Sequence, residues 1–138
     1  MLPMTVLQLV PLFSSADGGN MTYGKKVWIF PDAELPPAGV NLIPGHESVI
    51  ITNLCEEIAE IKVTLIYTDK NPVSFMTKVE AMRVRCLRTN EEKDFGTYTA
   101  VEGEQYAIML ESSVPIVAQY GRAEPRTVNF YTTPGYCE

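Results

Sequence analysis

The feature that most constrains the fold is an alternation of apolar and polar side chains between Ile61 and Tyr67. This period of two indicates a strand with one buried face, and only Ile66 breaks it on the polar side. Ten prolines and nine glycines divide the 138 residues into short pieces. Short strand-like runs at such spacing predict an all-β protein. We expect a single-domain antiparallel β-sandwich of about eight strands with little or no helix.

Other segments show the same character, and each is bounded by turn or loop residues. The further strands predicted are residues 27–30, 48–52, 77–87, 106–110, 116–120 and 127–132. Pro31 is expected to end the first strand, and the Pro/Gly-rich segment 35–44 cannot be a central strand. The nearly apolar run 116–120 suits a central strand that is covered on both faces.

Composition excludes several classes of function. The chain has 17 acidic and 11 basic residues and a net charge of −6, which argues against nucleic-acid binding and against adhesion to anionic lipid. Its three cysteines, Cys55, Cys86 and Cys137, form no C-x-x-C pair. An odd number of dispersed cysteines favours a reduced, cytoplasmic protein. No apolar run approaches the ~20 residues of a membrane span.

Three regions are expected along the chain. Residues 1–22 are predicted to be a flexible N-terminal extension, because the start lacks a positive n-region and Pro3 and Pro11 interrupt its apolar stretch. Residues 23–133 are expected to form the β-sandwich, and residues 134–138 a C-terminal tail. The extension is either the result of an over-long start or a poorly ordered arm.

A set of short motifs occurs in a fixed order along the chain. It runs as Gly24 and Trp28, Pro36-Pro37, His46-Glu47, Asn53, Asp69 with Pro72, Arg83/Arg85/Arg88, Ser112 or Ser113 with Pro115, Gln119 and Arg122. With this order and spacing, residues 24–133 resemble the family of the cyanobacterial sensory rhodopsin transducer.

The resemblance implies a compact β-sandwich that is commonly oligomeric, with a tetramer among the expected states. It implies a small-molecule-binding domain for sugars, sugar acids or related metabolites, and it does not imply an enzyme. The short sequence after Thr133 differs from the longer tail of the rhodopsin partner. This difference argues against rhodopsin coupling and leaves a membrane receptor open as a partner.

Six residues are candidates for ligand binding: Trp28, His46, Glu47, Arg85, Gln119 and Arg122. The only histidine and its neighbouring carboxylate stand at the mouth of a strand, where loop residues reach ligands, and can bond hydroxyls. The arginines can hold an anionic group bidentately, and the tryptophan can wall the site.

Structural roles compete with each of these assignments. His46 and Glu47 can close a turn or an oligomer contact. Arg83 and Arg85 share one strand face, which can equally be solvated or ion-paired. Gln119 can line a pocket or an oligomer seam, and core packing is the expected role of a single tryptophan in a first strand.

No catalytic residue, metal site or cofactor is predicted. The chain has no G-x-S-x-G motif, and one histidine with scattered carboxylates lacks metal-ligand spacing. We expect a non-enzymatic, cytosolic ligand-binding or signal-coupling domain. The alternative is an oligomeric protein-interaction subunit without a small-molecule pocket. A third possibility is a carbohydrate-active enzyme with a carboxylate pair drawn from Glu34, Glu47 and Glu111.

Overall fold

The computed structural model describes residues 23–38, 44–127 and 129–138. The predicted N-terminal extension, residues 1–22, lies outside this part of the chain. Pairing between the named strands is antiparallel throughout. The predicted all-β sandwich of about eight strands is therefore confirmed, and the helical content of the described residues is one four-residue α-helix followed by a three-residue 3₁₀ turn.

The elements follow one another along the chain with short connections. They are β1 (Lys25–Glu34), β2 (His46–Asn53), β3 (Ala59–Tyr67), β4 (Val73–Val79), β5 (Arg83–Arg88), α1 (Glu92–Phe95), the 3₁₀ turn η1 (Gly96–Tyr98), β6 (Gln105–Glu124), β7 (Asn129–Thr133) and β8 (Tyr136–Cys137).

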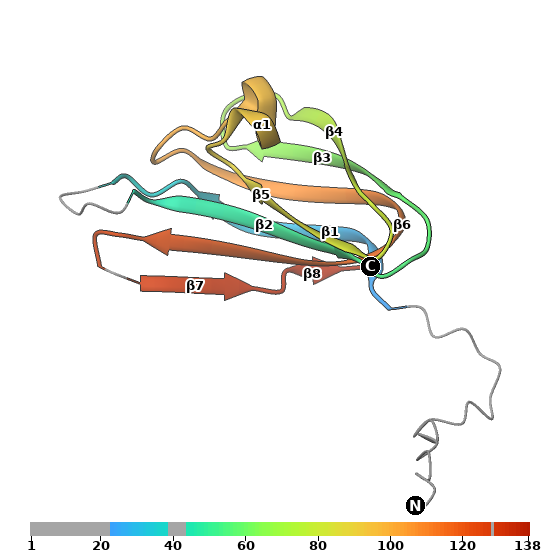
Figure 1. The fold of residues 1–138 in the computed structure, drawn as a ribbon. Coiled ribbons are helices and arrows are strands. Elements are labelled where there is room, and N and C mark those ends of the chain that lie inside the picture. The colour runs from blue at the N-terminus through green and yellow to red at the C-terminus, as the bar shows by residue number, and fades with distance from the viewer. Residues whose placement is uncertain (1–22, 39–43, 128) are drawn as a thin grey trace, which may run out of the picture.

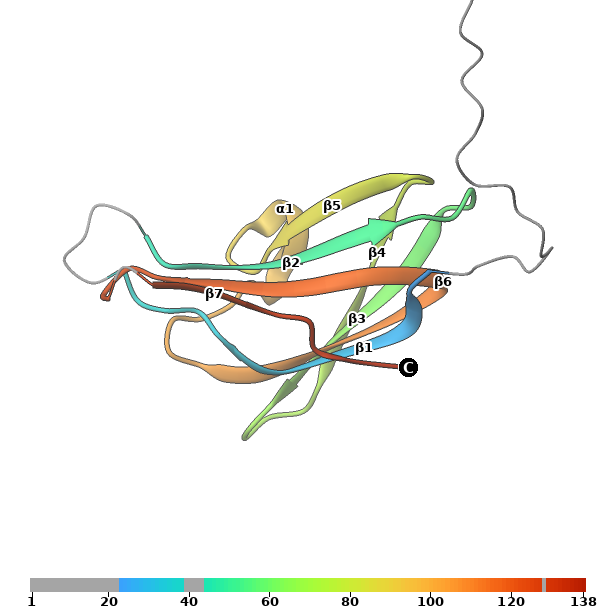
Figure 2. The same ribbon diagram turned by 90° about the horizontal axis from the view of Figure 1, so that it is seen from below.

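The long strand β6 belongs to both layers of the sandwich (Figure 1 and Figure 2). Its first half pairs with β3 on one side and with β1 on the other, which gives a first sheet in the order β4-β3-β6-β1-β8. Its second half pairs with β2 and β7, which gives a second sheet in the order β5-β2-β6-β7. The two sheets are thus joined through one continuous strand.

The core lies between these sheets and follows the alternation of the strands. On β3, Ile61, Val63 and Leu65 are at most 2% exposed, whereas Lys62 points outward. Each such buried aliphatic side chain contributes about 1.5–3 kcal/mol of burial free energy. The period of two at 61–67 therefore predicted the buried face of this strand correctly.

Two predicted strand boundaries were wrong. Pro31 does not end the first strand, because the register of β1 against β6 shifts between Phe30 and Ala33, and at a bulge the missing proline N–H breaks no ladder bond. Residues 106–110 and 116–120 are parts of the single strand β6. Pro115 stands where β6 passes from the first sheet to the second.

The predicted strand 77–87 was also wrong, since a turn divides it into β4 and β5. Met82 has a φ of 52° there and its N–H donates to the carbonyl of Cys55.

The run 116–120 is not covered on both faces, because Val117 is 40% exposed. Beyond Thr133 the chain adds the short strand β8, which pairs with β1.

Asn53 links the two sheets at one end of the sandwich. Its side chain is fully buried, and its Nδ2 lies 2.8 Å, 3.1 Å and 3.2 Å from the carbonyl oxygens of Glu57, Val79 and Glu80. Its Oδ1 accepts a hydrogen bond from the N–H of Cys55 at 2.9 Å. The end of β2 in the second sheet is thereby tied to the end of β4 in the first.

Replacing Asn53 with alanine is expected to lower the free energy of unfolding by about 2–3 kcal/mol, since buried carbonyl and N–H groups lose their partners. Urea unfolding measures this change. The control is Asn71→Ala, an exposed loop position, where the effect should stay within about 0.5 kcal/mol. Equal stabilities of the two variants would contradict this role of Asn53.

Candidate functional site

A fully buried carboxylate lies inside the sandwich, near the start of β2. The alternation of β2 turns Glu47 inward together with Val49 and Ile51, and all three are 0% exposed. Its Oε2 accepts hydrogen bonds from the hydroxyls of Tyr106 at 2.6 Å and Thr89 at 3.0 Å. Its Oε1 accepts one from the hydroxyl of Tyr120 at 2.5 Å. Three donors thus replace the water that a carboxylate needs.

Arg122 extends this network towards the surface. Its Nε donates to the hydroxyl of Tyr120 at 3.1 Å, and its Nη2 lies 3.5 Å from the carboxylate of Asp32. The guanidinium lies 5.1 Å from the ring centre of Tyr131, and its side chain is only 13% exposed. A positive charge is therefore held one hydroxyl away from the Glu47 carboxylate.

Burial and the neighbouring charge of Glu47 raise the pKa of both Tyr106 and Tyr120 far above the ordinary tyrosine value. Both phenols consequently remain protonated donors at any physiological pH. Burial, with a smaller effect of the Arg88 charge, lowers the pKa of His46. The imidazole is then neutral at pH 7, because an unshifted histidine already titrates near 6.5.

Trp28 is a core residue. It is 7% exposed, and its indole N–H lies 3.1 Å and 3.0 Å from the carbonyl oxygens of Lys25 and Ile116. Its ring stacks on Phe30 with centroids 6.5 Å apart. The core packing expected for this tryptophan is confirmed, and Trp28 lines neither of the two hollows described below.

His46 and Gln119 lie on the outer face of the second sheet. The strand register places His46 opposite Ala123 and Gln119 opposite Ile50. A small hollow of about 170 Å³ opens beside His46, where Gly121 leaves space next to Phe130. Arg122 is among the residues that line this hollow, but its Nε donates to the hydroxyl of Tyr120, a residue on the inner side of the sheet.

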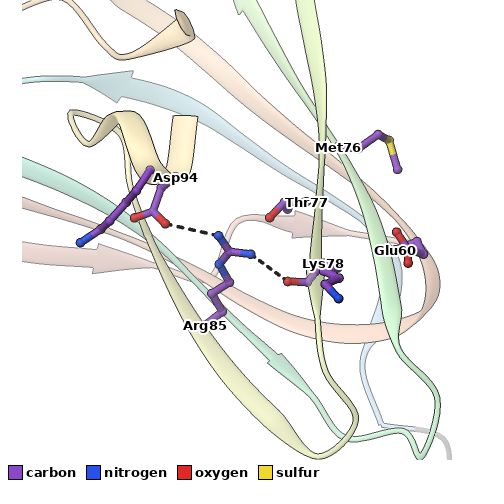
Figure 3. Close-up of a pocket in the computed structure, with 7 residues that line it drawn as sticks. Glu60, Met76, Thr77, Lys78, Arg85 and Asp94 are labelled. Carbon is purple, nitrogen blue, oxygen red and sulfur yellow. Dashed lines mark hydrogen bonds and ion pairs between the residues drawn. The ribbon is translucent and has the colours of Figure 1, made fainter. Parts of the chain in front are cut away.

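Arg85 stands at a second, larger hollow of about 350 Å³ between β4 and β5 (Figure 3). Its Nη1 donates to the carbonyl of Lys78 at 3.1 Å, and its Nη2 lies 3.4 Å from Asp94 Oδ1. The hollow is lined by Glu60, Met76, Thr77, Lys78, Arg85, Lys93 and Asp94.

The six candidates therefore do not share one cavity. Glu47 and Arg122 belong to one buried network, His46 and Gln119 to an outer sheet face, and Arg85 to the hollow beside β4. The predicted hydrogen bonding of Glu47 to ligand hydroxyls does not agree with its placement, because the carboxylate is enclosed and already accepts hydrogen bonds from three hydroxyls of the protein. The ligand contacts of His46, Arg85, Gln119 and Arg122 stay predictions.

The hydrogen-bond and ion-pair partners of Glu47, Arg122 and Arg85 were not identified from the sequence. Tyr120 and Arg122 have the same parity on their strand, which was a usable signal for a common face. Thr89 and Asp94 gave no such signal, since each meets its partner only through the folding of β5 and α1 against other strands.

Among the described residues, no group of three or more histidine, cysteine, aspartate or glutamate side chains is placed to hold a metal ion. The same part of the chain contains no helix with the length and apolar character that crossing a bilayer requires.

These features define, for the described residues, a small antiparallel sandwich with a hydrogen-bonded carboxylate in its interior and hollows beside His46 and Arg85. The family model described as Anabaena sensory rhodopsin transducer matches residues 23–136, and the chain belongs to that family. The resemblance seen in the short motifs is thereby confirmed.

Solved structures agree with this assignment. Thermotoga maritima 1070 is 32% identical over 83% of this chain and 96% of its own, with a TM-score of 0.71. The Anabaena sensory rhodopsin transducer is 30% identical over 72% of this chain and 89% of its own, with a TM-score of 0.63. No curated protein gave a significant match.

Replacing Glu47 with alanine is expected to lower the free energy of unfolding by about 3 kcal/mol or more, because three buried hydroxyls lose their common acceptor. Chemical denaturation followed by tryptophan fluorescence measures this loss. The control is Glu111→Ala, which removes a half-exposed ion pair with Lys62 and should cost at most about 1 kcal/mol. A cost of Glu47→Ala no greater than that of the control would contradict the central role of this carboxylate.

Alkaline pH should destabilise the domain through Tyr106 and Tyr120. Their pKa values are raised in the folded state, so the unfolded chain releases these protons first as the pH rises. Their stabilising contribution is complete below about pH 10 and falls by ~1.4 kcal/mol per pH unit for each tyrosine above it.

Unfolding free energies measured between about pH 9 and about pH 11.5, a range that brackets the ordinary tyrosine pKa, test this expectation. Tyr120→Phe should reduce the slope by ~1.4 kcal/mol per pH unit. Tyr136→Phe, at a side chain that is 59% exposed, is the control and should keep the wild-type slope. Identical slopes in all three proteins would rule out the mechanism.

Proposed function

We propose that this chain is a non-enzymatic signal-coupling domain that works by assembling with copies of itself. The observation that carries the proposal is the outer face of the second sheet, which is uncharged over most of its area. The family supports a coupling role, because a transducer acts by binding a partner.

The strand register defines this surface, which we call the outer face. Paired residues of antiparallel strands share a face, so four strands contribute alternate residues to it. The outer face consists of Val84, Cys86 and Arg88 on β5, His46, Ser48, Ile50 and Thr52 on β2, Val117, Gln119, Gly121 and Ala123 on β6, and Phe130 and Thr132 on β7.

Large apolar side chains are exposed along this face. Val84 is 64% exposed, Val117 is 40% exposed and Phe130 is 69% exposed. Arg88 is the single arginine or lysine among its described residues, and no carboxylate belongs to it. Exposed apolar surface of this kind marks an interaction site.

A second copy of the chain is the occupant that the charges favour. The whole chain carries a net charge of −6, so two copies repel each other through most of their surfaces. The outer face brings no acidic groups together when it meets itself. A two-fold interface requires one patch that is complementary to itself, and this face meets that condition.

The structure also supports a non-enzymatic reading. Glu47 lies inside the sandwich, whereas Glu111 pairs with Lys62 at 3.2 Å on the outside of the first sheet. These two carboxylates therefore do not face each other across a cleft, as glycoside hydrolysis requires. All three cysteines are free thiols, which supports a cytosolic location.

Small-molecule binding is the second candidate function, and the hollow at Arg85 favours it. The predicted ligand was a sugar or sugar acid. The polar lining of this hollow suits such a molecule better than the buried carboxylate does.

Replacing Val117 with glutamate should break the assembly, since a charge would be buried within the interface. Light scattering after size exclusion is expected to show an oligomer for the wild type and a monomer for the variant. The matched control is Ile66→Glu, because Ile66 is 39% exposed on a strand of the other sheet, and it should stay oligomeric. Melting temperatures confirm that both variants fold.

A monomeric wild type, or an equal effect of the two substitutions, would overturn assembly through the outer face. A wild-type monomer that joins only a different protein would place a receptor on this surface instead of a second copy.

A further inference from the structure

We propose that the hollow between β4 and β5 binds a small oxyanion, the carboxylate or phosphate group of a metabolite, with Arg85 as its anchor. This site is separate from the outer face, because Arg85 points to the inner side of β5 while Val84 and Cys86 point outward. The two proposals can therefore fail independently.

The hollow lies on the side of the sandwich where the two sheets are not joined by a strand. Within the described residues, β4 pairs only with β3 and β5 pairs only with β2. Arg85 reaches from β5 across to β4, and Figure 3 shows its guanidinium between Asp94 and the backbone of Lys78. A ligand here would contact both sheets.

The Arg85 guanidinium has N–H donors that do not bond any described residue. A guanidinium carries five N–H donors, and only Nη1 and Nη2 bond described residues, at 3.1 Å and 3.4 Å. The longer contact, to Asp94, exceeds the 2.7–2.9 Å of a strong charge-assisted bond. The Arg85 side chain is 36% exposed, so its remaining donors are accessible from the hollow.

Asp94 makes only a long contact with the Arg85 guanidinium, because its carboxylate also accepts a backbone hydrogen bond. Its Oδ2 accepts the backbone N–H of Arg88 at 3.0 Å, and its side chain is only 7% exposed. The carboxylate thus holds the segment after β5 in place. It orients Arg85 from one side and leaves the face of the guanidinium that looks into the hollow open.

The charge around the hollow is positive although the chain is acidic. Its lining has three cations, Lys78, Arg85 and Lys93, and two carboxylates, Glu60 and Asp94. Lys78 forms an ion pair with Glu80 at 2.9 Å, whereas Lys93 forms none with the described residues. Arg85 and Lys93 are therefore the two cations that an incoming anion would meet.

The uncharged residues that line the hollow, together with its volume, indicate what kind of molecule carries the oxyanion. Thr77 points from β4 towards Arg85, and its hydroxyl can bond a polar group (Figure 3). Met76 adds one apolar wall. The volume of about 350 Å³ lies at the lower end of the range for small-molecule sites. Such a space suits a compact polar metabolite with a single anionic group.

The test is an NMR titration of the ¹⁵N-labelled full chain with inorganic phosphate, glucose 6-phosphate, glucuronate and glucose as probes. Phosphate-bearing or carboxylate-bearing probes should shift the amide signals of Thr77, Lys78, Arg85, Lys93 and Asp94. Glucose, which has no oxyanion, should leave them unchanged. Comparing glucose 6-phosphate with glucuronate shows which of the two oxyanions the site prefers.

Arg85→Gln should weaken binding of the active probe at least tenfold. Arg85→Lys, which keeps the charge but loses the two-pronged geometry, should bind between wild type and Arg85→Gln. The matched control is Arg83→Gln, because Arg83 has the same parity on β5, donates to the carbonyl of Met82 at 2.9 Å and does not line the hollow. It should bind like the wild type.

The absence of shifts with every anionic probe would overturn the proposal. So would equal weakening by Arg83→Gln and Arg85→Gln, which would show a diffuse charge effect. Light scattering on Arg85→Gln should give the wild-type mass, because the outer face is unchanged, so loss of anion binding and loss of assembly are read separately.

Discussion

The sandwich depends on how the protein replaces water around the Glu47 carboxylate. A buried charge is tolerated only when hydrogen bonds satisfy it. Two of its three donors, Tyr106 and Tyr120, come from opposite halves of β6. The same carboxylate therefore holds both halves of the strand. A one-residue slip of β2 would turn Glu47 out and a neighbouring residue in, so this charge also selects the register of the second sheet.

Because β6 is hydrogen-bonded in both sheets, they cannot slide past each other as separate layers. Between its ladder with β3, which ends at Ser112, and its ladder with β2, which begins at Ile116, residues 113–115 pair with neither strand. Pro115 costs no ladder bond at this crossing. Asn53 ties the sheets again at the end of β2. On the side of the sandwich away from β6, Arg85 connects β5 to β4 through its hydrogen bond to the carbonyl of Lys78. The larger hollow opens there.

The local alternation of side chains predicted which face of a strand each residue occupies. Contacts between residues far apart in the sequence determined where strands end and which residues share a site. The parity of Arg83 and Arg85 and the buried side of 61–67 followed from a period of two. The proline at position 31 misled, because whether a bulge absorbs it depends on the partner strand. The environment of Glu47 could not be read from the chain, since Thr89 and Tyr120 are 42 and 73 residues away. To predict that residues share one site, one must know which strands face each other, and the alternation along a single strand does not reveal this.

β5 is the element that would connect the two proposed activities. It is an edge strand that carries Arg85 on its inner side and Val84 and Cys86 on its outer side. A ligand alters assembly only to the extent that it binds the assembled and free forms with different affinity. If β5 shifts when Arg85 engages an oxyanion, the outer face changes with it, and assembly must change anion affinity by the same factor in return. If β5 stays fixed, the two activities are independent. The position of this one strand therefore decides whether the domain couples a ligand signal to assembly or only hosts both events.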